Sequence, residues 1–206
     1  MRNRRLQGRI TAGRFTLPAV ILICIVCWIG TSILLPAMSS EKEAGYALWQ
    51  SVCTLYLPAW ADRAISFMLY AAIGYFLIEL NNTFAIIRMR ASVQTSIYFL
   101  LVTICPGMHL LYAGDIAAVA FLISLFFLFK SYQHPRPVSY IFHSFVFIGA
   151  GSLLFPQLLY FIPLWLIGAY YFQSLTARSF CAALIGLSVS YWFLFGHCLL
   201  YTSPSP

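Results

Sequence analysis

Two acidic residues, Asp62 and Asp115, are the side chains of this sequence best suited to chemistry. Asp62 lies just before one long apolar stretch of the chain, and Asp115 closes the tight turn 112–115 directly before another. A carboxylate at a membrane surface can act as a general base or a metal ligand, since ionisable groups at that depth are costly and often functional. The structural alternative is that Asp62 pairs with neighbouring Arg63 and that Asp115 caps the next helix.

A second group of candidates lies at the other end of the second apolar stretch, where Glu79 is followed by Arg88 and Arg90. Apolar residues interleaved with arginines suit an interfacial segment whose guanidinium groups meet lipid phosphates. A more specific hypothesis has Arg88 or Arg90 bind a phosphorylated substrate that Glu79 orients. We favour contact with anionic lipid.

Other reactive residue types form no recognisable site. The six cysteines make no disulfide framework, and the histidines lack metal-ligand spacing. The sequence contains no Walker motif, no G-x-G-x-x-G, no H-E-x-x-H and no nucleophile elbow. We therefore expect no metal and no cofactor. The expected partners are membrane lipids and other envelope proteins, with no nucleic acid.

The elements that would position these residues are membrane-spanning helices. With 62% hydrophobic and 8% charged residues and a mean hydropathy of +0.86, the chain has too little polar surface for a soluble globule. Because lipid offers no partners for backbone amides, each apolar stretch is expected to be a helix. The fourth to sixth are shorter than the roughly 17 to 25 residues of a usual span. The seven predicted spans are 15–36, 64–80, 96–112, 116–129, 140–154, 158–172 and 180–196.

The basic residues predict the orientation of this all-α, polytopic bundle. Ten of the twelve Lys and Arg fall on one side of the predicted topology, and the other side keeps only Lys42 and Arg63. The positive-inside rule then places the amino terminus in the cytoplasm. The ten are Arg2, Arg4, Arg5, Arg9, Arg14, Arg88, Arg90, Lys130, Arg136 and Arg178.

The predicted domain organisation is a basic cytoplasmic tail, 1–14, and a transmembrane domain, 15–197, with one long outer loop at 37–63. Apolar residues at helical spacing in this loop predict an amphipathic helix on the outer membrane face. Residues 198–206, Cys-Leu-Leu-Tyr-Thr-Ser-Pro-Ser-Pro, match one translation of a transposon end used to tag sequencing libraries. We expect this segment to be non-native and the natural protein to be longer.

Four short motifs carry a resemblance to a known group of proteins. They are Phe76-Leu-Ile-Glu-Leu-Asn81, Leu111-Tyr-Ala-Gly-Asp115, Gly149-Ala-Gly-Ser-Leu-Leu-Phe-Pro156, and the late Arg178 and Gly186. Together they resemble an uncharacterised family of multi-pass inner-membrane proteins of Bacteroides-type bacteria. The resemblance covers most of 14–197 and implies a location in the bacterial inner membrane, without an activity.

A second resemblance is to multi-spanning glycosyltransferases that use lipid-phosphate sugars. Their first outer loop bears an amphipathic helix and a catalytic acidic residue, and Asp62 and Asp115 stand at comparable places. The resemblance implies a polyprenyl-phosphate sugar donor, with Asp62 as general base and Asp115 as a supporting acid. Asp62 departs from the family pattern because it lies at the far end of the loop. Two hypotheses therefore stay open: a non-enzymatic protein that supports envelope assembly or a membrane complex, and a membrane-embedded transferase.

Overall fold

The computed structural model describes residues 16–34, 49, 58–86, 91–105 and 109–202. All regular secondary structure in these ranges is helical, which confirms the all-α prediction. The chain divides into two compact units. The first unit comprises residues 1–43 and 55–112, and the second comprises residues 44–54 and 113–206.

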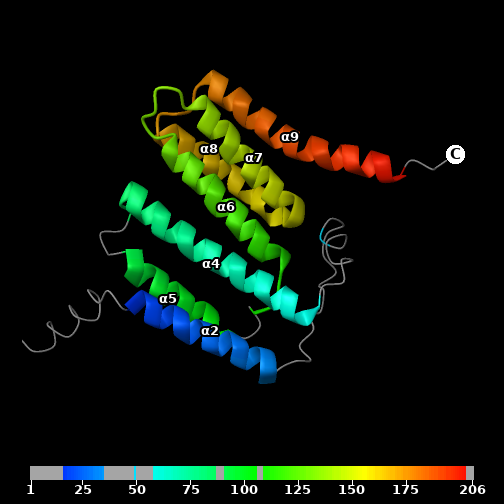
Figure 1. Cartoon of the computed structure of the whole chain (residues 1–206). Coiled ribbons are helices and arrows are strands. Elements are labelled where there is room, and N and C mark those ends of the chain that lie inside the picture. Colours follow the sequence, from blue (N-terminus) through cyan, green and yellow to red (C-terminus); the bar gives the residue numbers. More distant parts are fainter. Residues whose placement is uncertain (1–15, 35–48, 50–57, 87–90, 106–108, 203–206) are drawn as a thin grey trace, which may run out of the picture. The chain divides into compact units, whose positions relative to one another are not determined.

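In its described residues, the first unit contains α2 (Thr16–Leu34), α4 (Ala59–Phe84) and α5 (Ala91–Ile104). They lie side by side, and α4 runs opposite to α2 and α5 (Figure 1). The first unit has a small polar contact within its apolar packing, because Thr103 Oγ1 on α5 donates to Cys24 Sγ on α2 over 2.9 Å.

Two helix ends of the first unit differ from the predicted spans. Helix α4 begins directly after Pro58, which is its N-cap residue, and so starts before the predicted residue 64. Helix α5 ends at Ile104, so the prediction of a helix through residue 112 is wrong. The reason lies in Pro106 of the sequence, because proline disfavours helical geometry in the residue before it and has no N–H to continue the ladder.

The second unit contains α6 (Ala113–Lys130), α7 (Val138–Leu154), the 3-10 helix η2 (Pro156–Phe161), α8 (Ile162–Tyr171) and α9 (Ala177–Thr202). Helix α7 packs against both α6 and α9. Helices α7 and α9 run in the same direction, as Figure 1 shows. The core of the unit gathers around Trp165, Phe145 and Ile141, which are almost fully buried.

Small residues allow the helices of the second unit to approach closely. A Cβ added to Gly186 on α9 would lie 2.8 Å from the backbone oxygen of Phe142 on α7. A Cβ on Gly149 would lie 2.8 Å from Ser190 Oγ. Side chains larger than hydrogen at both positions would push the helices apart, so glycine is what permits this interface.

Three helices of the described chain are long and apolar enough to cross a membrane: Trp60–Phe84, Ala113–Lys130 and Ala177–Gly196. Shorter apolar helices cover Leu17–Thr31, Val93–Ile104 and Val138–Leu154. The predicted sixth span is a 3-10 helix followed by the ten-residue α8. The predicted amphipathic helix of the outer loop lies outside the described residues, apart from Trp49, which is buried.

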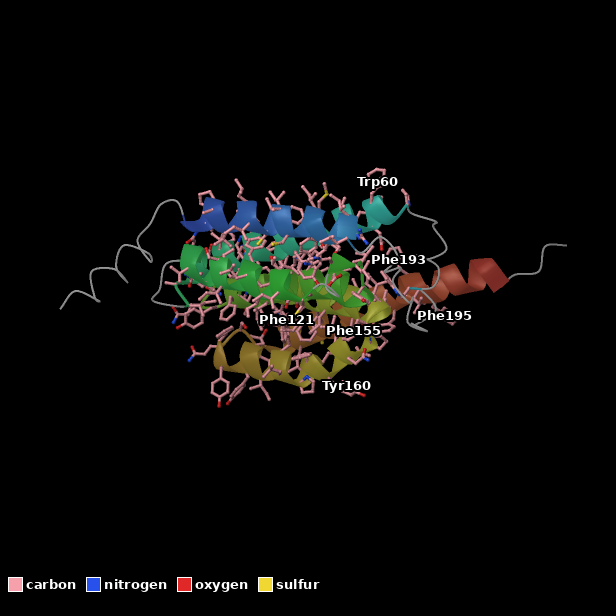
Figure 2. The ribbon with its side chains drawn as sticks, turned by 90° about the horizontal axis from the view of Figure 1, so that it is seen from below. Trp60, Phe121, Phe155, Tyr160, Phe193 and Phe195 are labelled. Atoms are coloured by element: carbon pink, nitrogen blue, oxygen red, sulfur yellow. The ribbon has the colours of Figure 1, made fainter. Side chains whose placement is uncertain are left out.

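The membrane character also appears on the outside of the helices. Trp192, Phe193 and Phe195 are each at least 60% exposed on α9, and the last two project from its second half (Figure 2). Large aliphatic side chains are likewise exposed along α2, where Leu34 is 80% exposed. Exposed apolar side chains in such number on one helix favour a surrounding of lipid or of another apolar surface.

Candidate functional site

The most distinctive polar site of the first unit is centred on His109. The imidazole stacks on the ring of Trp28 with centroids 3.8 Å apart and an interplanar angle of 22°. Only 2% of the His109 side chain is exposed. Because Trp28 lies on α2, this contact holds the segment that begins at His109 against α2.

The hydrogen bonds of His109 leave one ring nitrogen unused. Its Nδ1 lies 2.8 Å from Thr31 Oγ1, and the same hydroxyl lies 2.9 Å from the carbonyl oxygen of Trp28. When the single hydroxyl proton of Thr31 goes to that carbonyl, His109 Nδ1–H must be the donor to Thr31. The buried Nε2, which has no hydrogen-bond partner among the described residues, then carries a lone pair that can accept a proton donor.

The surroundings of His109 favour its neutral form. Burial lowers the pKa of His109 below its ordinary value of 6.5, and the positive charge of Arg63 lowers it further. Arg63 is itself buried, and its backbone oxygen accepts a hydrogen bond from Trp28 Nε1 over 3.3 Å. His109, Trp28, Thr31 and Arg63 therefore form one connected group, here called the His109 cluster.

A small pocket of about 220 Å³ adjoins the His109 cluster between α2 and α4. Its walls are apolar except for Arg63, and they include Trp28, Ile25 and Phe67. Trp60 lies at the pocket and is 72% exposed; its side chain projects outward at the start of α4 (Figure 2). The pocket has the size and the mostly apolar lining to hold a small apolar group.

The two predicted acidic residues occupy equivalent places in different units. Asp62 lies in the first turn of α4 and is partly exposed. Asp115 lies in the first turn of α6 and is 7% exposed. Helix α6 begins at Ala113, so Asp115 lies inside the helix rather than before it, where a capping residue was expected. A negative charge in the first turn is stabilised by the helix dipole, so this position suits both a structural and a catalytic role of the two residues.

The predicted inner site is described only in part. Glu79 lies on α4, and its Oε1 accepts a hydrogen bond from Thr83 Oγ1 over 3.3 Å. Arg88 and Arg90 lie outside the described residues. Their role in binding lipid or phosphate therefore stays a prediction.

Two other histidines of the described chain, His134 and His143, are held by local contacts. His143 Nδ1 lies 2.6 Å from the carbonyl oxygen of Ser139, one turn earlier on α7. His134 Nδ1 accepts the backbone N–H of Arg136. Cys24 is buried whereas Cys27 is exposed, so the two thiols of the C-x-x-C pair have different surroundings. The described residues contain no group of three His, Cys, Asp or Glu side chains that could hold a metal ion.

Sequence reasoning missed the His109 cluster because its members are far apart in the chain. Within α2, Trp28 looks like any membrane-facing aromatic residue. The one local signal is Thr31, which lies one helical turn after Trp28 and so presents a hydroxyl on the same face.

Protein-family models, curated proteins and solved structures contain no match to this chain.

Proposed function

We propose that this chain is a multi-pass bacterial inner-membrane protein that supports envelope assembly or a membrane complex through its helical packing. Its amino terminus lies in the cytoplasm in this proposal, as the distribution of Lys and Arg predicts. Three helices of sufficient length and apolarity support the membrane location.

The observation that carries the proposal is how the second unit uses its buried hydroxyl groups. Ser190 Oγ on α9 donates to the backbone oxygen of Val146 on α7 over 3.0 Å, and Ser152 bonds Tyr191 across the same interface. Among residues 113–196, whose side chains the structure describes, every fully buried side-chain nitrogen and oxygen has a hydrogen-bond partner. Groups committed to helix packing in this way are not available to bind a substrate, which supports a structural role.

A membrane-embedded glycosyltransferase that uses a polyprenyl-phosphate sugar donor is the second candidate. It is favoured by the position of Asp115, because an acidic residue that is largely buried near a membrane surface is rare and often functional. In this candidate, Asp62 and Asp115 would be the catalytic acids.

Complementation of a deletion strain separates the two candidates. Asp62→Asn and Asp115→Asn keep the side-chain shape and remove the charge. The structural proposal predicts that both variants, and the double variant, restore the envelope phenotype when their abundance matches the wild type. Loss of complementation at matched abundance, together with accumulation of the lipid-linked sugar donor measured by mass spectrometry, would establish the transferase instead. Ser188→Ala, an exposed change on α9, is the matched control for expression.

A further inference from the structure

A large open pocket of about 1080 Å³ lies where α7 and α9 begin. Its lining residues come from two segments only, 135–142 and 176–185. Helices α7 and α9 run in the same direction and pack together (Figure 1), and residues at the amino-terminal ends of both helices line the pocket. The pocket belongs entirely to the second unit and is separate from the His109 cluster.

Two positively charged side chains line the pocket. Arg136 and Arg178 both line it and are both exposed. Neither guanidinium makes a hydrogen bond or an ion pair with another residue of the described chain. None of the lining residues is acidic. Two unpaired guanidinium groups at one opening can bind the oxygens of a phosphate group by charge-assisted hydrogen bonds.

The backbone adds to this positive charge. Helix α7 follows Pro137 and has no side-chain hydrogen bond at its N-cap. Helix α9 is capped by Thr176, whose Oγ1 accepts the backbone N–H of Ser179. The two helix dipoles therefore point their positive ends at the same pocket, where α7 keeps uncapped N–H groups.

Apart from the two arginines, Ser139 and Thr176, the side chains that line the pocket are apolar. Phe142 on α7 and Ala182 and Ile185 on α9 form its walls. Ile185 is 56% exposed, and Trp192, which lies two helical turns later on the same face of α9, is 73% exposed. The apolar surface therefore continues along the outside of α9, in the direction that an acyl chain takes through a bilayer.

We infer that this pocket binds an anionic phospholipid, with the phosphate headgroup at Arg136 and Arg178 and an acyl chain along Phe142 and Ile185. A phosphate on an apolar tail matches both halves of the pocket, whereas a soluble phosphate compound would leave the apolar walls exposed to water. Cytoplasmic leaflets are rich in anionic lipid, and the charge distribution places both arginines on that side. The inference rests on the membrane location and is independent of whether the chain is catalytic.

Native mass spectrometry of the full chain, released from detergent with added phosphatidylglycerol or phosphatidylcholine, tests the inference. We expect the wild type to retain phosphatidylglycerol in preference to phosphatidylcholine. Arg136→Gln and Arg178→Gln should each lower the phosphatidylglycerol affinity about fivefold, and the double variant about 20-fold or more, as expected for about 1 kcal/mol per basic residue near a lipid surface. Lys130→Gln is the matched control, because it removes a neighbouring positive charge that does not line the pocket.

Two further measurements identify the source of the phosphate. Ile185→Ser should weaken phosphatidylglycerol binding and leave Arg-dependent binding of inorganic phosphate unchanged. Equal retention of the two lipids by the wild type would overturn the inference, even if the arginine variants fold poorly. An unchanged affinity for phosphatidylglycerol in a folded Arg136→Gln/Arg178→Gln variant would also overturn it. Displacement of the bound phosphatidylglycerol by inorganic phosphate would show that the pocket binds a free phosphate instead.

Discussion

Ser124 and Ser144 exchange hydrogen bonds across the interface of α6 and α7, each hydroxyl donating to the backbone oxygen of the other residue. The two distances are 2.7 and 2.8 Å. Both hydroxyl oxygens also accept the indole N–H of Trp165 on α8, at 2.8 and 3.0 Å. Three helices are thereby joined through one buried group, which we call the serine clamp. A shared polar group of this kind fixes the relative rotation of helices that apolar contacts alone would leave less defined.

The serine clamp predicts a non-additive loss of stability. Ser124→Ala should lower the free energy of unfolding by about 1 kcal/mol, since Trp165 keeps its bond to Ser144. Ser144→Ala should cost about the same, and the double variant should cost about 3 to 4 kcal/mol, more than the sum of about 2 kcal/mol, because the buried indole N–H then has no acceptor. Denaturant unfolding in detergent, followed by circular dichroism, measures both. If the cost of the double variant equals the sum of the two single costs, Trp165 does not couple the two serines. Ser188→Ala is the neutral control.

Gly186 provides a sharper test of the α7–α9 interface. Gly186→Ala places a methyl group 2.8 Å from the backbone oxygen of Phe142, and backbone cannot move aside as a flexible side chain can. We expect a loss of about 1 to 3 kcal/mol in unfolding free energy from this overpacking. Gly196→Ala on the same helix is the matched control, because nothing lies within 4 Å of its added Cβ.

The two glycine variants should differ in sign. Gly196→Ala should stabilise the protein by about 0.5 to 1 kcal/mol through helix propensity alone. If Gly186→Ala also stabilised the protein in the same unfolding assay, the close approach of α7 and α9 would be contradicted.

Hydrophobic pattern predicted most helices because lipid and the protein interior both demand apolar side chains and internally bonded backbone. It failed where proline interrupts an apolar run. The run from Leu158 to Phe172 reads as one helix, yet its first part is a 3-10 helix that begins at Pro156, and α8 begins around Pro163. Apolar composition is the same in both helix types, so the sequence carries only the prolines as a signal.

The candidate sites were less predictable than the helices. Asp62 and Asp115 stand out in a sequence with only five acidic residues, and their helix-start positions could be read from the neighbouring loops. The stacking of Trp28 on His109 depends on how α2, α4 and the connection after α5 pack, which no local pattern encodes. Arg136 and Arg178 likewise line one pocket only because α7 and α9 are adjacent and parallel.

His109 predicts a pH dependence of stability. Its pKa in the folded protein is lower than in the unfolded chain, first through burial and then through Arg63. At a pH between the two values, the unfolded chain binds more protons, so stability falls as pH decreases through this range. The stabilisation is fully present above about pH 6.5, the ordinary histidine value. The thermal unfolding midpoint should therefore be lower at about pH 5 than at about pH 8.

Substitution shows whether this pH dependence belongs to His109. His109→Phe keeps an aromatic ring against Trp28 and removes the titrating group, so its unfolding midpoint should vary less with pH than that of the wild type. His143→Phe, a change at an exposed histidine, should leave the wild-type dependence in place. The same pH dependence in His109→Phe would assign it to another group.

The topology of α7 tests the membrane arrangement most directly. This helix has 17 residues, which at about 1.5 Å per residue is a few ångströms short of a typical hydrocarbon core of about 30 Å. Its contacts with α6 and α9, both long enough to span, would hold it across the bilayer. Gln133 and Gln157 are exposed at its two ends. In a chain without native cysteines, we expect a membrane-impermeant thiol reagent to label Gln157→Cys in intact cells and Gln133→Cys only after permeabilisation. Labelling of both in intact cells would show that α7 does not cross, and the reverse pattern would place the amino terminus outside.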